Sequence, residues 1–569
     1  MSKSRHDERY DMISDADRPR LQQRLGDFGA DLAILNANVI TMNPAQPRAE
    51  AVAVRNGRIV AVGGNEIVRQ RCGARTELVD LGGKTLLPGF VESHNHVSAY
   101  SHIVLQIDCT PRTCKSIDDI LKQVKARADS QPPGTWIDGY GFDNTALVEQ
   151  RWITRWEHDE VAPDHPVHLW HISGHFTAVN SKALEMANID RNTPNPDGGE
   201  IVRGEDGEAT GILAEPPAQL LVLRLIPDKT LEESVRGLGI VSDEYVAAGV
   251  TSAHDANMGV WGGLSELQAY ERAIAEGTFK PRIYALMWTM LEDLRDHGAD
   301  LADLGICTGL GDDRFRLGGV KIFADGSIPG LTAALKKPYL ADPDNKGYLI
   351  FQQEELDEIV LRYHEAGFQL AIHANGDLCI ETTINAFENA LKKAPRPDHR
   401  HRIEHLPMAS DEDVRRMADL GIVTTFYTAQ IWGWGDRQRE KFLGPERAER
   451  LYPTQTAKQE GIRFGLHGDC PVTPISPLHC LYTAVARETS SGHILGPEQR
   501  IDVHDALKAL TIDGAYLAFE ENEKGSIEIG KMADFVSLSE NPYEMEPTAL
   551  KDLAVEMTII DGELVYQTT

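Results

Sequence analysis

The stretch Pro88-Gly-Phe-Val-Glu-Ser-His-Asn-His96 is the starting point for predicting the fold. It is a short, mostly apolar run that begins at turn-forming residues, which is typical of a buried strand. His94 and His96 close the run two residues apart, so both imidazoles point to the same face of an extended strand. Such a pair can reach one ion, although a single His-x-His pair also occurs by chance.

Seven further runs of this kind follow along the chain, each separated from the next by helical or loop sequence. Eight strand-and-helix repeats are the pattern of a TIM barrel, in which parallel strands form the inner ring. We therefore predict an α/β fold, a distorted (β/α)8 TIM barrel. The predicted strands are residues 89–96, 250–256, 282–288, 320–326, 369–376, 401–406, 422–430 and 462–469.

Both ends of the chain are rich in short β runs. The dipeptides Asn56-Gly57 and Asp561-Gly562 lie between such runs, and each is a strong hairpin signal. We therefore predict one small β-sandwich domain that is built from both termini.

Well over a hundred residues separate the first two predicted barrel strands, which is too long for one βα crossover. We expect an inserted subdomain there, lining or covering the site. The predicted parts are a flexible tail at residues 1–27, a composite β-sandwich domain at 28–88 and 520–569, a barrel domain at 89–105 and 231–519, and the insertion at 106–230.

The composition limits the classes of partner. A formal net charge of −30 argues against nucleic acid, because binding phosphates needs concentrated Lys and Arg. Seven cysteines without a CxxC pair favour reduced thiols and a cytoplasmic protein. The polar first residues lack the apolar core of a secretory signal, and no apolar stretch is long enough to cross a membrane.

Six residues with metal-binding chemistry lie at or near the C-terminal ends of predicted strands. That is the barrel face on which active sites form. Any one of these residues alone has an ordinary explanation, such as a polar surface group or a turn carboxylate. Their placement on one rim is what argues against chance. They are His94, His96, Lys321, His373, His405 and Asp469.

Lys321 is the unusual member, because it lies in the apolar run Val-Lys-Ile-Phe. Burying a cationic amine is costly, so the group either finds a partner or shifts its pKa. A structural lysine paired with a carboxylate and a neutral amine that becomes modified both fit this pattern. Periodicity does not choose between them.

The runs PGFVESHNH, VKIFADGS, AIHANGD, RIEHL and GLHGDCPV resemble the amidohydrolase superfamily, most closely its amidohydrolase-3 (YtcJ-like) branch. The resemblance covers nearly the whole chain and holds in order and spacing. It implies a hydrolase of carbon–nitrogen bonds, such as those of N-substituted formamides, N-acyl amides or cyclic amides. It also implies a homodimer.

The resemblance assigns a role to each ligand. His94 and His96 bind the more buried metal, and His373 and His405 bind the second. Lys321 becomes a carbamate that bridges the two ions. Asp469 touches the first metal and acts as general base toward a metal-bound hydroxide. Nitrogen ligands with one carboxylate suit Zn²⁺, and other divalent ions are alternatives.

One position departs from the family pattern. Gly468 stands where a serine is common, which removes a hydroxyl near the metals but no ligand.

Four further residues are candidates for substrate contact. These residues lie in the insertion or near the ends of predicted strands. For each of them, an ordinary structural role in the core or on the surface is the alternative. They are His175, His254, Asp325 and Trp432.

Three other functions stay open. The same scaffold hosts hydrolases of esters or carbamates and deaminases. The second alternative is hydrolysis by a Ser or Cys nucleophile. The sequence contains no GxSxG motif for a nucleophilic serine, and Cys470 does not stand at the start of a helix, where its thiolate would be activated. A catalytically silent binding or regulatory protein is the third, since a fold does not guarantee its chemistry.

Overall fold

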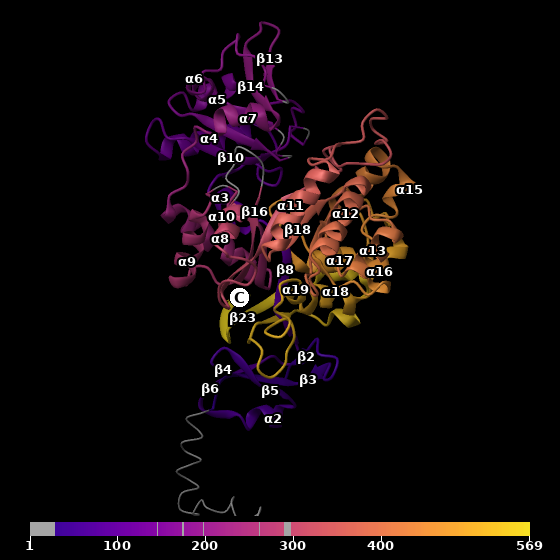
Figure 1. Ribbon diagram of the computed structural model, residues 1–569. Coiled ribbons are helices and arrows are strands. Elements are labelled where there is room, and N and C mark those ends of the chain that lie inside the picture. The colour runs from indigo at the N-terminus through magenta and orange to yellow at the C-terminus, as the bar shows by residue number, and fades with distance from the viewer. Residues whose placement is uncertain are drawn as a thin grey trace, which may run out of the picture. The chain divides into compact units, whose positions relative to one another are not determined.

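A computed structural model describes residues 29–144, 146–172, 174, 176–196, 199–260, 262–289 and 297–568 (Figure 1). The predicted tail at residues 1–27 lies outside the described residues. The described chain falls into two compact units. One comprises residues 98–241 and 260–273, and the other comprises the remaining described residues.

Eight strands form the inner sheet of the larger unit, in the order β21-β20-β19-β18-β17-β16-β15-β8, and all neighbours are parallel. Each strand overlaps one predicted barrel strand, so the predicted barrel is confirmed. The strands are β8 (Phe90–Asn95), β15 (Val250–Met258), β16 (Arg282–Trp288), β17 (Phe315–Phe323), β18 (Gln369–Ala374), β19 (Arg402–His405), β20 (Val423–Phe426) and β21 (Phe464–Leu466).

The first and last strands of this sheet approach each other and nearly close the barrel. Ser93 Oγ in β8 donates a hydrogen bond to the carbonyl oxygen of Leu466 in β21 at 3.1 Å. Gly465 makes this approach possible, because a Cβ there would lie 2.2 Å from Ser93 Oγ. Because β8 and β21 lie next to each other, the eight strands surround one axis.

Helices alternate with the barrel strands. Figure 1 shows α11 and α12 side by side next to β18. The predicted strand at residues 422–430 is too long, because Ala429 already begins a helix. The helices are α2 (Asn65–Arg69), α3 (Val97–Ile103), α4 (Ile117–Ser130), α5 (Arg155–Val161), α6 (Ser181–Met186), α7 (Glu215–Leu223), α8 (Leu231–Ala247), α9 (Ser265–Ala275), α10 (His297–Asp303), α11 (Gln353–Glu365), α12 (Asp377–Lys393), α13 (Asp411–Leu420), α14 (Ala429–Arg437), α15 (Pro445–Ala448), α16 (Thr454–Gln459), α17 (Pro477–Ala486), α18 (Val503–Ala509) and α19 (Ile512–Leu517).

Two smaller sheets of the larger unit use strands from both ends of the chain. β7 pairs antiparallel with β22, which joins the two ends, and one apolar cluster contains residues from both. The sheets are β5-β4-β1-β6 and β24-β23-β22-β7-β2-β3. Their strands are β1 (Ala30–Leu35), β2 (Asn38–Ile40), β3 (Arg48–Ala49), β4 (Ala51–Arg55), β5 (Arg58–Gly63), β6 (Cys72–Asp80), β7 (Thr85–Pro88), β22 (Phe535–Leu538), β23 (Val555–Ile560) and β24 (Glu563–Gln567).

Both predicted hairpins are confirmed. Asn56 and Gly57 have φ of 50° and 70° between β4 and β5, and Asp561 and Gly562 have φ of 54° and 77° between β23 and β24. Two successive left-handed residues are what a tight hairpin turn requires, and asparagine, aspartate and glycine adopt that conformation most readily.

The smaller unit has a sheet and a core of its own. Its sheet has the order β13-β14-β12-β11-β10-β9, and residues such as Ile120, Val167 and Leu169 are buried against it. The sequence after β8 thus forms a folded body and not one long loop. The strands are β9 (Ile107–Asp108), β10 (Ile137–Phe142), β11 (Val167–His171), β12 (Phe176–Val179), β13 (Glu200–Arg203) and β14 (Ala209–Ala214).

A buried ion pair fixes the C-terminal strands to the barrel. Arg282, at the start of β16, donates from Nε and Nη2 to the Asp534 carboxylate at 2.7 and 3.0 Å. Both side chains are almost fully buried, at 2% and 4% exposure. Burial alone would raise the pKa of Asp534, but the Arg282 guanidinium outweighs burial and holds that pKa below its usual value.

We predict that Asp534→Asn lowers the free energy of unfolding by about 3–5 kcal/mol, because it leaves the buried Arg282 guanidinium without its main counterion. Asp313→Asn is the matched control. Asp313 is half exposed and 3.0 Å from Arg58, so its loss should lower the free energy of unfolding by less than about 1 kcal/mol. Chemical denaturation measures both, and equal losses would contradict the prediction.

Candidate metal centre

The six predicted ligands come together on the C-terminal rim of the barrel. His94, Lys321, His373 and His405 lie within β8, β17, β18 and β19, and the other two follow strand ends. The pairing of neighbouring strands brings these residues to a similar height along the barrel: Phe323 is paired with His373, and Ala374 with His405. All except His96, which is partly exposed, are buried: His94, Lys321, His373, His405 and Asp469.

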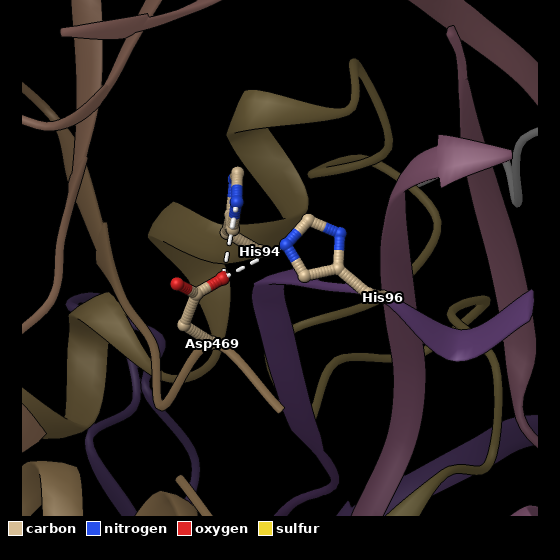
Figure 2. Close-up of side chains that lie close together, drawn as sticks. All are labelled: His94, His96 and Asp469. Carbon is tan, nitrogen blue, oxygen red and sulfur yellow. Dashed lines mark ion pairs between the residues drawn. The ribbon is translucent and has the colours of Figure 1, made fainter. Parts of the chain in front are cut away.

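His94, His96 and Asp469 form one tight group. Asp469 Oδ1 lies 3.4 Å from His94 Nε2 and 3.1 Å from His96 Nε2 (Figure 2). Neither His94 Nε2 nor Asp469 Oδ1 makes a hydrogen bond within the described residues. Three ligand atoms that converge in this way are suited to sharing a cation.

A second group contains His405, His467 and Asp469, whose ligand atoms lie within 4.8 Å of one another. His405 Nδ1 and His467 Nε2 are 3.3 Å apart. His467 was missed by the sequence analysis. The signal was present, because His467 precedes Asp469 by two residues in the Gly-Leu-His-Gly-Asp run that supplied the aspartate.

Lys321 and His373 both contact the ring of Phe323. Lys321 Nζ is 4.3 Å from the centre of the Phe323 ring, and the His373 ring stacks on Phe323 at 4.5 Å. Lys321 Nζ makes no hydrogen bond within the described residues. Burial lowers the pKa of Lys321 to about 8, although Glu404 and Asp469 act in the opposite direction.

Glu404 determines how His94 faces the site. Its buried carboxylate contacts His94 Nδ1, so His94 Nε2 is left to face Asp469. Arg402 donates to both Glu404 oxygens, at 2.8 and 3.1 Å, and Thr425 Oγ1 donates at 2.8 Å. A carboxylate behind a histidine fixes its tautomer and raises its basicity toward a metal. Arg402 and Glu404, two charges in one buried run, were the sequence signal for this network.

Two of the predicted ligands have a strained backbone conformation. His405 has φ of 71° and Asp469 has φ of 57°, in the left-handed region that residues other than glycine rarely adopt. Such strain persists only where the surrounding structure enforces it, and it concentrates at functional sites.

Three of the four candidate substrate residues lie among the described residues. His254 is fully buried and its Nδ1 lies 2.9 Å from Arg402 Nη1, so it belongs to the network beneath the ligands. Trp432 is 45% exposed and meets His479 edge-on. His175 lies outside the described residues.

Asp325, the fourth candidate, is tied to the backbone. It accepts the amide N–H groups of Asn375, Gly376 and Ala334 at 2.8–3.0 Å. Burial raises the pKa of Asp325 to about 7, against the effect of these amides. Its geometry suits positioning the loop that follows His373.

The donor set fits a divalent cation. The histidines are buried and their pKa values lie below the usual range, chiefly because of burial, so the rings of His94, His373 and His405 are neutral. His94 Nε2, His373 Nδ1 and Asp469 Oδ1 are buried atoms without a hydrogen bond in the described chain. Buried polar atoms normally have partners, and lone pairs of neutral imidazoles beside an ionised carboxylate are the partners that Zn²⁺ takes.

The sequence is similar to known proteins over most of its length. The profile of the amidohydrolase family matches residues 77–566. The chain belongs to the amidohydrolase family. It is a hydrolytic enzyme acting on carbon–nitrogen bonds, and the resemblance predicted from its motifs is confirmed.

Individual relatives match over almost their whole length. The chain is 33% identical to an N-substituted formamide deformylase of Arthrobacter pascens, over 95% of this chain and 99% of that one. It is 32% identical to the putative amidohydrolase YtcJ of Bacillus subtilis, over 93% and 98%. An uncharacterized metal-dependent hydrolase from Pyrococcus horikoshii superposes with a TM-score of 0.74 at 25% identity, over 91% of this chain and 99% of that one.

No helix among the described residues is long and apolar enough to cross a membrane.

We predict that Glu404→Gln weakens metal binding by about 10- to 100-fold, because an amide cannot both face His94 Nδ1 as an acceptor and satisfy Arg402. Competition with a chelator, followed by metal analysis, measures the change. Glu388→Gln is the control, because Glu388 pairs with Lys392 and Arg416 in partly exposed contacts away from the rim. Unchanged affinity in Glu404→Gln would contradict the role given to Glu404.

Proposed function

We propose that this chain is a metal-dependent hydrolase that cleaves the carbon–nitrogen bond of an uncharged amide, with N-substituted formamides as the first class to test. The observation that carries the proposal is the set of neutral histidines around one ionised aspartate on the barrel rim. The full-length similarity to a formamide deformylase supports the substrate class.

The ligand assignment combines the His94, His96 and Asp469 group with the pattern that the family resemblance implies. His94, His96 and Asp469 would hold one Zn²⁺ ion, and His373 and His405 would hold a second. His467 stands beside His405 as a further nitrogen donor. When bound, such ions promote ionisation of water at neutral pH and polarise the carbonyl of a substrate.

Asp469 is suited to the proton transfers of the reaction. Burial alone would raise its pKa, but the imidazoles of His405, His96 and His467 hold the pKa of Asp469 well below its usual range. The carboxylate is therefore ionised at neutral pH. It accepts a proton from the attacking water and passes that proton to the leaving nitrogen.

Lys321 is suited to modification by carbon dioxide. Its amine is buried and without a hydrogen bond in the described chain, and its lowered pKa leaves part of the population neutral at neutral pH. The neutral nitrogen attacks the carbon of carbon dioxide, a nitrogen–carbon bond forms as one carbon–oxygen π bond breaks toward oxygen, and the nitrogen releases a proton to water. The product is a carbamate with two oxygens that could bridge two cations.

An aromatic pair beside Lys321 supports an apolar substituent on the substrate. Trp288 and Phe323 are partly exposed at the ends of β16 and β17, with ring centres 4.9 Å apart. Trp288 is paired with Lys321 across the two strands. This pair is therefore a better candidate than Trp432 for contact with the substrate.

Hydrolysis of esters or carbamates and deamination are the competing reactions on this scaffold. A panel of N-formyl, N-acyl and cyclic amides, esters and aminopurines separates them by product, since a deaminase releases ammonia and a deformylase releases formate.

We predict that Asp469→Asn lowers kcat on the best amide of the panel by at least about 100-fold, because an amide cannot accept the proton. Metal content is measured in the same preparations, so that loss of a ligand is separated from loss of the base. Glu388→Gln again serves as the control for loss of one negative charge. Retention of full activity would exclude Asp469 as the general base.

We predict that Lys321→Ala binds less metal than the wild type and that acetate restores binding, because a free carboxylate can occupy the space of the carbamate. Lys321→Met is the matched control, since its side chain fills that space and acetate should have no effect. Native mass spectrometry of the wild type should show the mass of one added carbon dioxide. Wild-type metal binding by Lys321→Met would refute the bridging role.

A further inference from the structure

Tyr427 occupies a position at the metal centre to which no role has been given. It is the first residue after β20 and is only 3% exposed. Its ring stacks on His467 at 5.1 Å and 23°, and it lies 6.0 Å from the His405 ring. The phenol is therefore packed against the same histidines that surround Asp469.

The hydroxyl of Tyr427 is buried and makes no hydrogen bond within the described residues. Two other buried tyrosines of this unit, Tyr452 and Tyr339, are bonded. Tyr452 donates to Gln430 Oε1, and Tyr339 donates to the Ala333 carbonyl oxygen at 2.9 Å. A buried hydroxyl without a partner destabilises a protein, so its retention calls for an explanation.

The chemistry of the phenol limits what it can do. The ordinary pKa of a tyrosine phenol is about 10, well above neutral pH. The group thus keeps its proton and acts as a hydrogen-bond donor. The structural alternative is a hydrogen bond between the phenol and the side chain of Thr473, which lies beside it and whose own hydroxyl donates to the Gly468 carbonyl oxygen.

We propose that Tyr427 is a catalytic residue that donates a hydrogen bond to the carbonyl oxygen of the substrate as that oxygen becomes negatively charged. The inference rests on the proposed amide hydrolysis. It deepens that proposal, because a donor poised for an oxyanion selects substrates in which a carbonyl carbon is attacked. Attack on the amidine carbon of an aminopurine places the charge on nitrogen instead.

The step balances without a change in the protonation of Tyr427. The water oxygen bonds to the carbonyl carbon, its proton goes to Asp469, and the π electrons move to the carbonyl oxygen. The hydrogen bond from Tyr427 strengthens as this charge grows. On collapse the carbonyl re-forms, the carbon–nitrogen bond breaks, and the leaving nitrogen takes the proton from Asp469. Removing one donor of this kind typically lowers kcat by about 100- to 1,000-fold.

The test is Tyr427→Phe in the metal-loaded full chain, assayed on the best amide of the panel. This change removes the oxygen and keeps the ring that stacks on His467. We expect kcat to fall by about 100-fold or more with little change in KM or metal content. We also expect a melting temperature equal to or above that of the wild type, because a buried hydroxyl without a partner is removed.

Two control variants separate catalysis from structure. Tyr452→Phe removes a hydroxyl that is hydrogen-bonded, so it should lower the melting temperature and leave kcat nearly unchanged. Thr473→Val removes the alternative partner and should leave kcat within a few-fold of the wild type. A loss of kcat in Thr473→Val equal to that in Tyr427→Phe would overturn the proposal, because the phenol would then act through the loop.

The failure of this proposal is distinguishable from that of the proposed function. If Asp469→Asn is inactive while Tyr427→Phe retains kcat within a few-fold, the role of Tyr427 is refuted and amide hydrolysis stands. If Tyr427→Phe destabilises the chain as much as Tyr452→Phe does, the phenol has a structural partner and the role is also refuted. If the metal-loaded wild type cleaves no amide of the panel, both proposals fall.

Discussion

The carboxylate of Glu404 and the guanidinium of Arg402 are buried together inside the barrel, with neither side chain exposed. Taking two charges out of water costs several kcal/mol per ion, and the pair persists because nearly every donor and acceptor is used. Arg402 also donates to the Ser93 carbonyl oxygen at 2.6 Å and contacts His254, while Glu404 contacts His94. The pair therefore ties β8 and β15 to β19, and the orientation of His94 depends on it.

This network also determines the electrostatics of the rim. Burial lowers the pKa of His94 and His405 far enough to keep both rings neutral, and nearby cationic groups lower the pKa of His94 further. Glu404 is buried as well, yet Arg402 and Lys321 hold its pKa below the usual value. Neutral nitrogens and ionised carboxylates are the combination that a divalent cation needs. The protein thus lowers the proton affinities of both the histidines and the Glu404 carboxylate within one small volume.

The fold was largely predictable because strand periodicity and turn chemistry are local signals. The pair His94 and His96 was predictable for the same reason, since two-residue spacing fixes a shared face. Glu404, His467 and Tyr427 were not predicted, because their importance lies in contacts between strands. Lone residues of these types in a buried run are compatible with ordinary packing. Only the register of β19 to its neighbours and the closure of β21 onto β8 bring them to the site.

The positions of the functional groups separate two physical requirements. His94, His373 and His405 lie within strands, where the hydrogen-bonded sheet holds ligand distances nearly constant. Asp469 and Tyr427 follow strand ends, where the backbone leaves the sheet. A cation site needs fixed distances, whereas Asp469 as the proposed general base also has to reach two partners, the attacking water and the leaving nitrogen. Barrel strands that end at one rim meet both requirements, because the sheet holds the last residues of each strand and does not hold the residues that follow.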